Sequence, residues 1–161
     1  TNRSQAMKSE ERIERVTGLA RTPGSGCGKL FKGDNGDEQW HVEDKSTRKD
    51  YLQVQRIWWE KVLYQAASKH KPMMALCLSS PFGRYVMLPS DVTRGYEYVG
   101  DYSVQANSFR IDATHCPEVL LLQDNQKVGI LWHNTTKFNM PRFTAIVTEL
   151  TWRQHVERNK Q

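Results

Sequence analysis

The sequence has few cysteines and no long apolar run. Its three cysteines, Cys27, Cys77 and Cys116, are widely spaced and form no Cys-x-x-Cys pair. This pattern excludes a disulfide framework and favours a reducing, cytoplasmic environment. Because no apolar segment is long enough to cross a bilayer and no secretory signal pattern opens the chain, we expect a protein without a membrane partner.

Motifs that bind nucleotides or read DNA bases are also missing. The segment from Arg21 to Gly28 is rich in glycine, but no Gly-Lys-Ser/Thr follows it, which excludes a Walker phosphate-binding loop. Glycines at this density still permit a ligand to approach the backbone closely. No helix-turn-helix or zinc-finger pattern is present, so contact with DNA would depend on its shape and phosphates rather than on its sequence.

Charge is unevenly distributed along the chain, which has a formal net charge of +5. Residues 1–33 carry a net charge of +4, residues 34–45 a net charge of −4, and residues 46–72 again +4. Basic segments attract a polyanion, and an acidic segment between them can attract a cation.

The first half of the chain mixes helical and strand patterns. A charged helix is expected from Ser9 to Val16, and strands are expected over 30–34 and 39–45 with a turn at Asn35-Gly36. Apolar residues then repeat every four positions, which predicts a helix from about 52 to 70.

The second half is expected to be mostly β. Neither a repeat nor a long linker requires a second domain, so we expect residues 1–161 to form a single domain of α/β or α+β class around a mixed sheet. Strands are expected over 73–78, 84–88, 108–111, 119–123, 127–132 and 143–150, and a short polar helix over 152–160.

The triplet Glu43-Asp44-Lys45, within the expected strand 39–45, has the most direct chemical meaning. Side chains alternate along a strand, so Glu43 and Lys45 are expected on one face and Asp44 on the other. A carboxylate beside an ammonium group can bind a divalent metal while the lysine steadies an attacking water or a developing negative charge. Such triplets are common as surface ion pairs, so the flanking sequence decides the meaning of this one.

The flanking segments resemble the PD-(D/E)xK nuclease family, and more narrowly its phage and archaeal Holliday junction resolvases. The resemblance implies a restriction-endonuclease-like core over roughly residues 9–90, with a central mixed β-sheet flanked by helices, and a β-rich C-terminal extension over 91–161. It rests on the order and spacing of a first helix with Glu10, the loop Pro23-Gly24-Ser25-Gly26, Lys32-Gly33-Asp34, Val42-Glu43-Asp44-Lys45-Ser46-Thr47, and Lys71-Pro72-Met73-Met74-Ala75-Leu76 at the end of the following helix.

The resemblance implies a metal-dependent active site. Asp34, Glu43 and Glu10 would bind the metal, joined by the backbone carbonyl of Asp44, and oxygen ligands of this kind favour Mg²⁺, with Mn²⁺ able to substitute. Lys45 would orient the attacking water or offset charge on the scissile phosphate. The metal-activated water would hydrolyse a phosphodiester bond.

Other residues of the first segments have implied roles or remain alternatives. The resemblance places Ser25 near the scissile phosphate. It places a glutamate of the first helix at the metal, and Glu11 and Glu14 remain alternatives to Glu10 for that role.

The aspartate that would join Glu43 is also open. A tight turn at Asn35-Gly36 would pair Asp34 with Asp37 and keep Asp34 several residues from Glu43. Asp37 therefore remains an alternative ligand, and aspartate is favoured in turns for reasons unrelated to metal binding.

Basic residues surround the proposed site and are expected to contact DNA phosphates, which makes binding strongly dependent on salt. The resemblance implies branched DNA, most specifically a four-way junction, as the partner, and a homodimer that matches the two-fold symmetry of the junction. It implies a cytoplasmic location in a phage-infected host cell or at the nucleoid. The basic residues are Arg12, Arg15, Arg21, Lys29, Lys32, Arg48 and Lys49.

Two other functions are compatible with the same residues. One is a nuclease of the same fold with another substrate, such as a restriction-like, nicking or exonucleolytic enzyme. The other is a non-catalytic module that binds DNA or protein. The second is disfavoured because Asp34, Glu43 and Lys45 are all present, whereas a decayed site usually loses one such residue.

Overall fold

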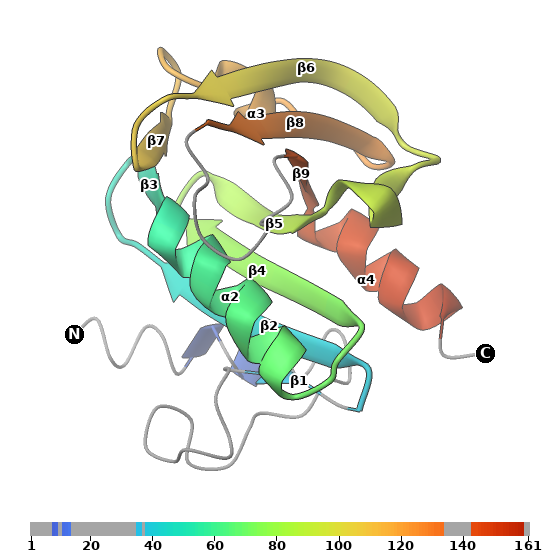
Figure 1. The fold of residues 1–161 in the computed structure, drawn as a ribbon. Helices are drawn as coiled ribbons and strands as arrows, with labels where there is room; N and C mark the ends of the chain where they lie inside the picture. Colours follow the sequence, from blue (N-terminus) through green and yellow to red (C-terminus); the bar gives the residue numbers. More distant parts are fainter. Residues whose placement is uncertain (1–7, 10, 14–34, 37, 134–142, 160–161) are drawn as a thin grey trace.

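The computed structural model of the chain describes residues 8–9, 11–13, 35–36, 38–133 and 143–159. These residues form a mixed α+β fold around a seven-stranded sheet with the strand order β1-β2-β4-β5-β9-β8-β6 (Figure 1). The strands are β1 (Asn35–Gly36), β2 (Trp40–Ser46), β4 (Met73–Ser80), β5 (Gly83–Pro89), β6 (Glu97–Val104), β8 (Gln126–Trp132) and β9 (Phe143–Thr148).

The sheet is mixed, as the sequence predicts. β2 pairs with β4 and β6 pairs with β8 in parallel, whereas the other neighbours are antiparallel. β3 (Leu52–Gln55) and β7 (Ser108–Ile111) form a separate antiparallel pair. Strands after residue 90 thus complete the same sheet that the earlier strands begin.

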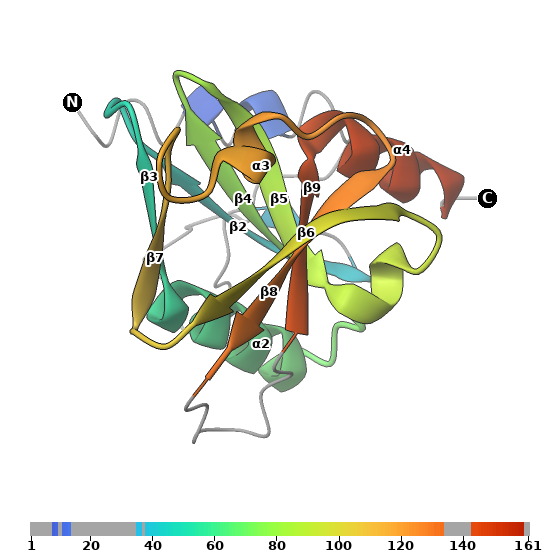
Figure 2. The ribbon, with the colours of Figure 1, turned by 90° about the horizontal axis from the view of Figure 1, so that it is seen from above.

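Helices cover both faces of this sheet, as the view from above shows (Figure 2). The helix α2 (Arg56–Ser68), the β3–β7 pair and α3 (Pro117–Leu120) cover one face, where Trp59 and Trp132 are fully buried. The helix α4 (Glu149–Arg158) covers the other face with Trp152. A short 3-10 helix, η1 (Ser90–Thr93), follows β5. Among the described residues, no helix is long and apolar enough to cross a membrane.

The parallel pairing of β2 with β4 brings the carboxyl ends of two strands to one edge. In this register Glu43 lies opposite Leu76, Lys45 opposite Leu78, and Ser46 opposite Ser79. Loops that follow the carboxyl ends of parallel strands are common places for ligand sites. The fold therefore places the Glu43-Asp44-Lys45 triplet next to such an edge.

The prediction of a turn at Asn35-Gly36 is wrong. Both residues belong to β1, where Asn35 pairs with Val42 and Gly36 with His41. Pairing with β2 outweighs the local preference of Asn-Gly for a turn. The connection between the two strands therefore begins after Gly36, so the tight turn that would have paired Asp34 with Asp37 is not formed at this dipeptide.

Two further expectations are corrected near helices. The helix expected from residue 52 begins at Arg56, because Leu52–Gln55 alternates buried and half-buried residues and pairs with β7 as a strand. The strand expected over 119–123 is absent, since Pro117 occupies the first turn of α3.

The end of the chain is corrected in a similar way, and one strand was missed. The strand expected to reach residue 150 ends at Thr148, whose hydroxyl accepts a hydrogen bond from the Thr151 N–H and caps α4. The last helix therefore begins at Glu149, before the predicted residue 152. The strand β6 was not expected from the sequence.

Candidate functional site

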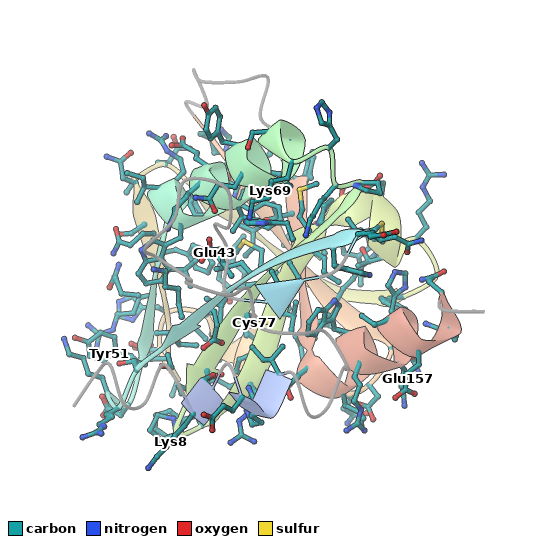
Figure 3. The ribbon with its side chains drawn as sticks, turned by 90° about the horizontal axis from the view of Figure 1, so that it is seen from below. Lys8, Glu43, Tyr51, Lys69, Cys77 and Glu157 are labelled. Carbon is teal, nitrogen blue, oxygen red and sulfur yellow. The ribbon has the colours of Figure 1, made fainter. Side chains whose placement is uncertain are left out.

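Glu43 and Lys45 lie on the same face of β2, as the alternation of a strand predicts. Trp40 and Val42 point into the core beneath α4, so Glu43 faces α2 on the other side of the sheet. Figure 3 shows Glu43 toward α2 and Cys77 on the side away from it. The carboxylate is buried, with 4% of Glu43 exposed.

Two basic side chains lie close to the Glu43 carboxylate. Its Oε1 atom is 3.7 Å from Nε2 of His41 and 3.9 Å from Nζ of Lys61. His41 comes from the same strand, whereas Lys61 reaches the site from α2. The Lys61 side chain is 52% exposed, so it approaches the buried carboxylate from solvent.

Lys45 lies further along β2, beside the first turns of α2. Its Nζ atom is 5.4 Å from the centroid of the Trp58 ring, a distance typical of a cation–π contact. Trp58 and Lys61 are three residues apart and therefore lie on one face of α2. Hence Glu43 and Lys45 both face the same side of this helix.

A groove of about 630 Å³ opens beside Lys45. Among the described residues, its charged lining is entirely basic and comes from Lys45, Arg48 and Lys49. Its uncharged lining includes two glutamines and two aromatic residues. A groove with this lining attracts a polyanion. The remaining residues along it are Ser46, Thr47, Tyr51, Leu52, Gln53, Gln55 and Trp58.

The aromatic rings of the groove are themselves stacked with cations. Tyr51 lies 3.8 Å from the guanidinium carbon of Arg110 and 5.5 Å from Nζ of Lys49, and Trp58 lies next to Lys45. These rings hold positive groups in place rather than presenting bare faces to bases. The groove therefore suits contact with the phosphates of a nucleic acid more than stacking of its bases.

Asp44 lies on the opposite face of β2 from Glu43, as expected. It pairs in register with Cys77, which belongs to the core beneath α4, and its side chain is buried. The Asp44 side chain therefore does not share the α2 side with Glu43 and Lys45. Only its backbone remains available for the role that the resemblance implies.

The basic residues expected to contact DNA fall into three groups. Arg48 and Lys49 are exposed at the groove. Arg12 is buried on the other face of the sheet, where its guanidinium pairs with Glu149 and donates to Ser79 Oγ. The last group, which includes Arg15, Arg21, Lys29 and Lys32, lies outside the described residues.

Several other predicted residues also lie outside the described part of the chain. These are Asp34, Glu10 and Ser25, together with the alternatives Glu14 and Asp37. Glu11 is described and is an exposed helical residue. Within the described ranges, no group of three or more His, Cys, Asp or Glu side chains is arranged to hold a metal ion.

Sequence reasoning missed two residues of the site. Tyr51 was not predicted as a groove residue, nor was Lys61 predicted beside Glu43. For Trp58 the adjacent pair Trp58-Trp59 offered a signal, because neighbouring helical residues face about 100° apart and one of the two is expected to be less buried. Trp59 is the buried member, and Trp58 is left for the groove.

Comparison of the chain with protein-family models, curated proteins and solved structures finds no match. The function of the protein is therefore inferred from its residues and their geometry.

Proposed function

We propose that this protein is a Mg²⁺-dependent endodeoxyribonuclease that hydrolyses phosphodiester bonds in branched DNA, as a Holliday junction resolvase does. The observation that carries the proposal is the placement of Glu43 and Lys45 on one face of β2, next to a groove whose charged lining is basic. A carboxylate suits a divalent cation, and an ammonium group suits a phosphate.

The order of elements is compatible with a restriction-endonuclease-like core. A strand pair, β1 and β2, precedes α2, and β4 returns parallel to β2. The described residues after position 90 then extend the sheet beyond β5.

The proposed metal site includes residues that lie outside the described part of the chain. Glu43 supplies a buried carboxylate, and the Lys61 ammonium group 3.9 Å from it favours its charged form. One carboxylate does not hold Mg²⁺ by itself, and Asp34 and Glu10 are the proposed further ligands. A bound Mg²⁺ would supply charge neutralisation and activate water.

The chain's own residues supply the remaining steps. Lys45 orients the attacking water or offsets charge on the scissile phosphate, and its ammonium group is steadied by Trp58. Arg48 and Lys49 bind phosphates of the same nucleic acid along the groove. A homodimer would present one such site to each of two strands of a junction.

A non-catalytic DNA-binding module is the second candidate, and one observation favours it. Lys61 lies at ion-pair distance from Glu43, and its ammonium group offsets the carboxylate charge without a metal. In that case the groove would bind nucleic acid and nothing would be cut.

Incubation with four-way, flap, linear duplex and single-stranded DNA, in Mg²⁺ or in EDTA, tests the proposal. Paired symmetric nicks in the four-way junction, only with Mg²⁺, are the expected result. Degradation of linear DNA would instead indicate a nuclease of another substrate class. Binding without cleavage of any substrate would favour the non-catalytic module.

Two lysine variants separate chemistry from binding. Lys45→Ala is expected to abolish cleavage and to leave junction affinity largely intact, because Lys45 is one of several cations along the groove. Lys69→Ala is the matched control, since Lys69 caps the carboxyl end of α2, away from Lys45. Equal activity of the two variants would contradict the role of Lys45.

A further inference from the structure

A second basic pocket lies on the other face of β2 from the Glu43 side. It has a volume of about 280 Å³, less than half that of the groove beside Lys45. Four cations line it, and no acidic residue does among those described. These cations are Lys8, Arg12, Arg48 and Arg84.

We propose that this pocket binds a single phosphate group of the nucleic acid. Arg12 is held in a fixed position, because its guanidinium pairs with Glu149 and donates to Ser79 Oγ over 3.3 Å. Arg84, in contrast, is exposed and makes no ion pair with the described residues. One preorganised arginine and one available arginine form a suitable clamp for a phosphate.

Hydroxyl groups support the same assignment. Ser9 lines the pocket, is 8% exposed, and its buried Oγ has no hydrogen-bond partner among the described residues. A buried hydroxyl without a partner calls for a ligand or a water molecule. Ser46, Ser79 and Ser80 contribute further hydroxyls at the carboxyl ends of β2 and β4. Ser46 and Ser79 offer hydroxyl donors to phosphate oxygens from both strands, whereas the Ser80 hydroxyl donates to the Gly83 carbonyl.

The pocket and the groove meet at the end of β2. Ser46, Thr47 and Arg48 line both of them, and in Figure 3 Lys8 and Tyr51 mark the two sides of this end. A nucleic-acid strand that passes over residues 46–48 can therefore place one phosphate near Lys45 and another in the pocket. The claim that the bound strand is also cut rests on the proposed function. The affinity of the pocket for phosphate is independent of that function.

Titration with inorganic phosphate tests the pocket without reference to cleavage. Binding is measured by calorimetry and by backbone amide NMR shifts, at constant ionic strength maintained with chloride. Saturable binding with shifts at Ser46, Ser79 and Ser80 is expected. Arg84→Ala is expected to weaken it about 10-fold, the loss typical of one charge-assisted hydrogen-bonding group.

The matched control is Arg94→Ala. Arg94 is also exposed but follows η1, beyond the opposite end of β5 from Arg84. It should leave phosphate affinity unchanged. Absence of saturable binding, or equal weakening in both variants, would overturn the proposal.

Oligonucleotides with and without a 5′-phosphate identify the source of the phosphate. If Arg84→Ala weakens binding of both, the pocket takes an internal phosphodiester; if it weakens only the phosphorylated one, the pocket takes a terminal phosphate. If Arg84→Ala leaves the affinity for both oligonucleotides unchanged, the pocket does not bind a phosphate of the nucleic acid, and the proposal is wrong. Phosphate binding in a protein that cuts no DNA would instead contradict the nuclease and leave the pocket in place.

Discussion

Glu43 and Lys127 are both buried ionisable side chains of the same sheet, and their surroundings differ in kind. Lys127 on β8 is 3% exposed, and its ammonium group donates to the Thr93 carbonyl and lies 3.3 Å from Thr93 Oγ1. The same Nζ atom is 4.4 Å from the centroid of the Tyr98 ring. Burial lowers the pKa of Lys127, and these contacts hold the charge in place.

The basic side chains beside Glu43 are arranged differently. One of them, Lys61, reaches the carboxylate from solvent and can withdraw without opening the core. A basic groove lies next to the Glu43 side, whereas Lys127 serves to tie η1 to the sheet. Burial of a charge is therefore not in itself a sign of function. A replaceable partner beside an open groove distinguishes the candidate site from the structural one.

The largest expected difference between the two residues is in activity. Glu43→Gln is expected to reduce DNA cleavage on the order of 10²-fold or more, because the amide no longer offers a negative ligand. Lys127→Met preserves the apolar stem and should cleave at close to the wild-type rate. Initial rates on a four-way junction at saturating Mg²⁺ measure both. Comparable losses of cleavage rate in the two variants would mean that Glu43 has no catalytic role beyond that of a buried structural charge.

The second expected effect is on stability, where the buried Lys127 is compared with an exposed lysine. Lys127→Ala is expected to lower the free energy of unfolding by about 2–3 kcal/mol, because the buried Thr93 carbonyl loses its donor and the lysine stem leaves a void. Lys49→Ala, at an exposed lysine, should stay within about 0.5 kcal/mol of wild type. Urea denaturation followed by tryptophan fluorescence provides both values. A loss below about 1 kcal/mol for Lys127→Ala would mean that its contacts contribute little.

The elements that were predicted well are those whose own residue pattern determines their secondary structure. The apolar runs of β4 and β8 and the alternating pattern of β2 led to boundaries within two residues of those observed. In contrast, β6 is largely exposed and has no apolar period to detect. Leu52–Gln55 was assigned to a helix because Val54 continues the four-residue repeat of α2, although its pairing with β7 makes it a strand.

The site divides in the same way. The shared face of Glu43 and Lys45 follows from strand alternation and needs no tertiary information. The positions of Trp58 and Lys61 depend on how α2 docks onto β2, which no local pattern specifies. The pocket at Arg84 depends on the parallel pairing of β2 with β4, between residues more than 30 positions apart.

A smaller effect tests whether Lys61 is the replaceable partner of Glu43. Lys61→Met should lower the Mg²⁺ concentration for half-maximal cleavage severalfold, because a competing cation near the carboxylate is removed. Its effect on stability should not exceed about 1 kcal/mol, as for other half-exposed ion pairs. Lys69→Met serves as the control. An unchanged or higher Mg²⁺ requirement would place Lys61 outside the metal site.

The smallest expected effect concerns His155 on α4. This half-buried group lies neither at the candidate site nor beside Lys127. Burial, and then the charge of Arg158, lowers the pKa of His155 below its ordinary value. The unfolded chain therefore takes up a proton first as the pH falls, so the stability associated with His155 is present above about pH 6.5 and is lost below it. Urea denaturation at pH 7.5 and 5.5 should show a smaller pH-dependent loss for His155→Gln than for the wild type. An equal loss in both proteins would mean that burial at α4 does not oppose the charge of His155.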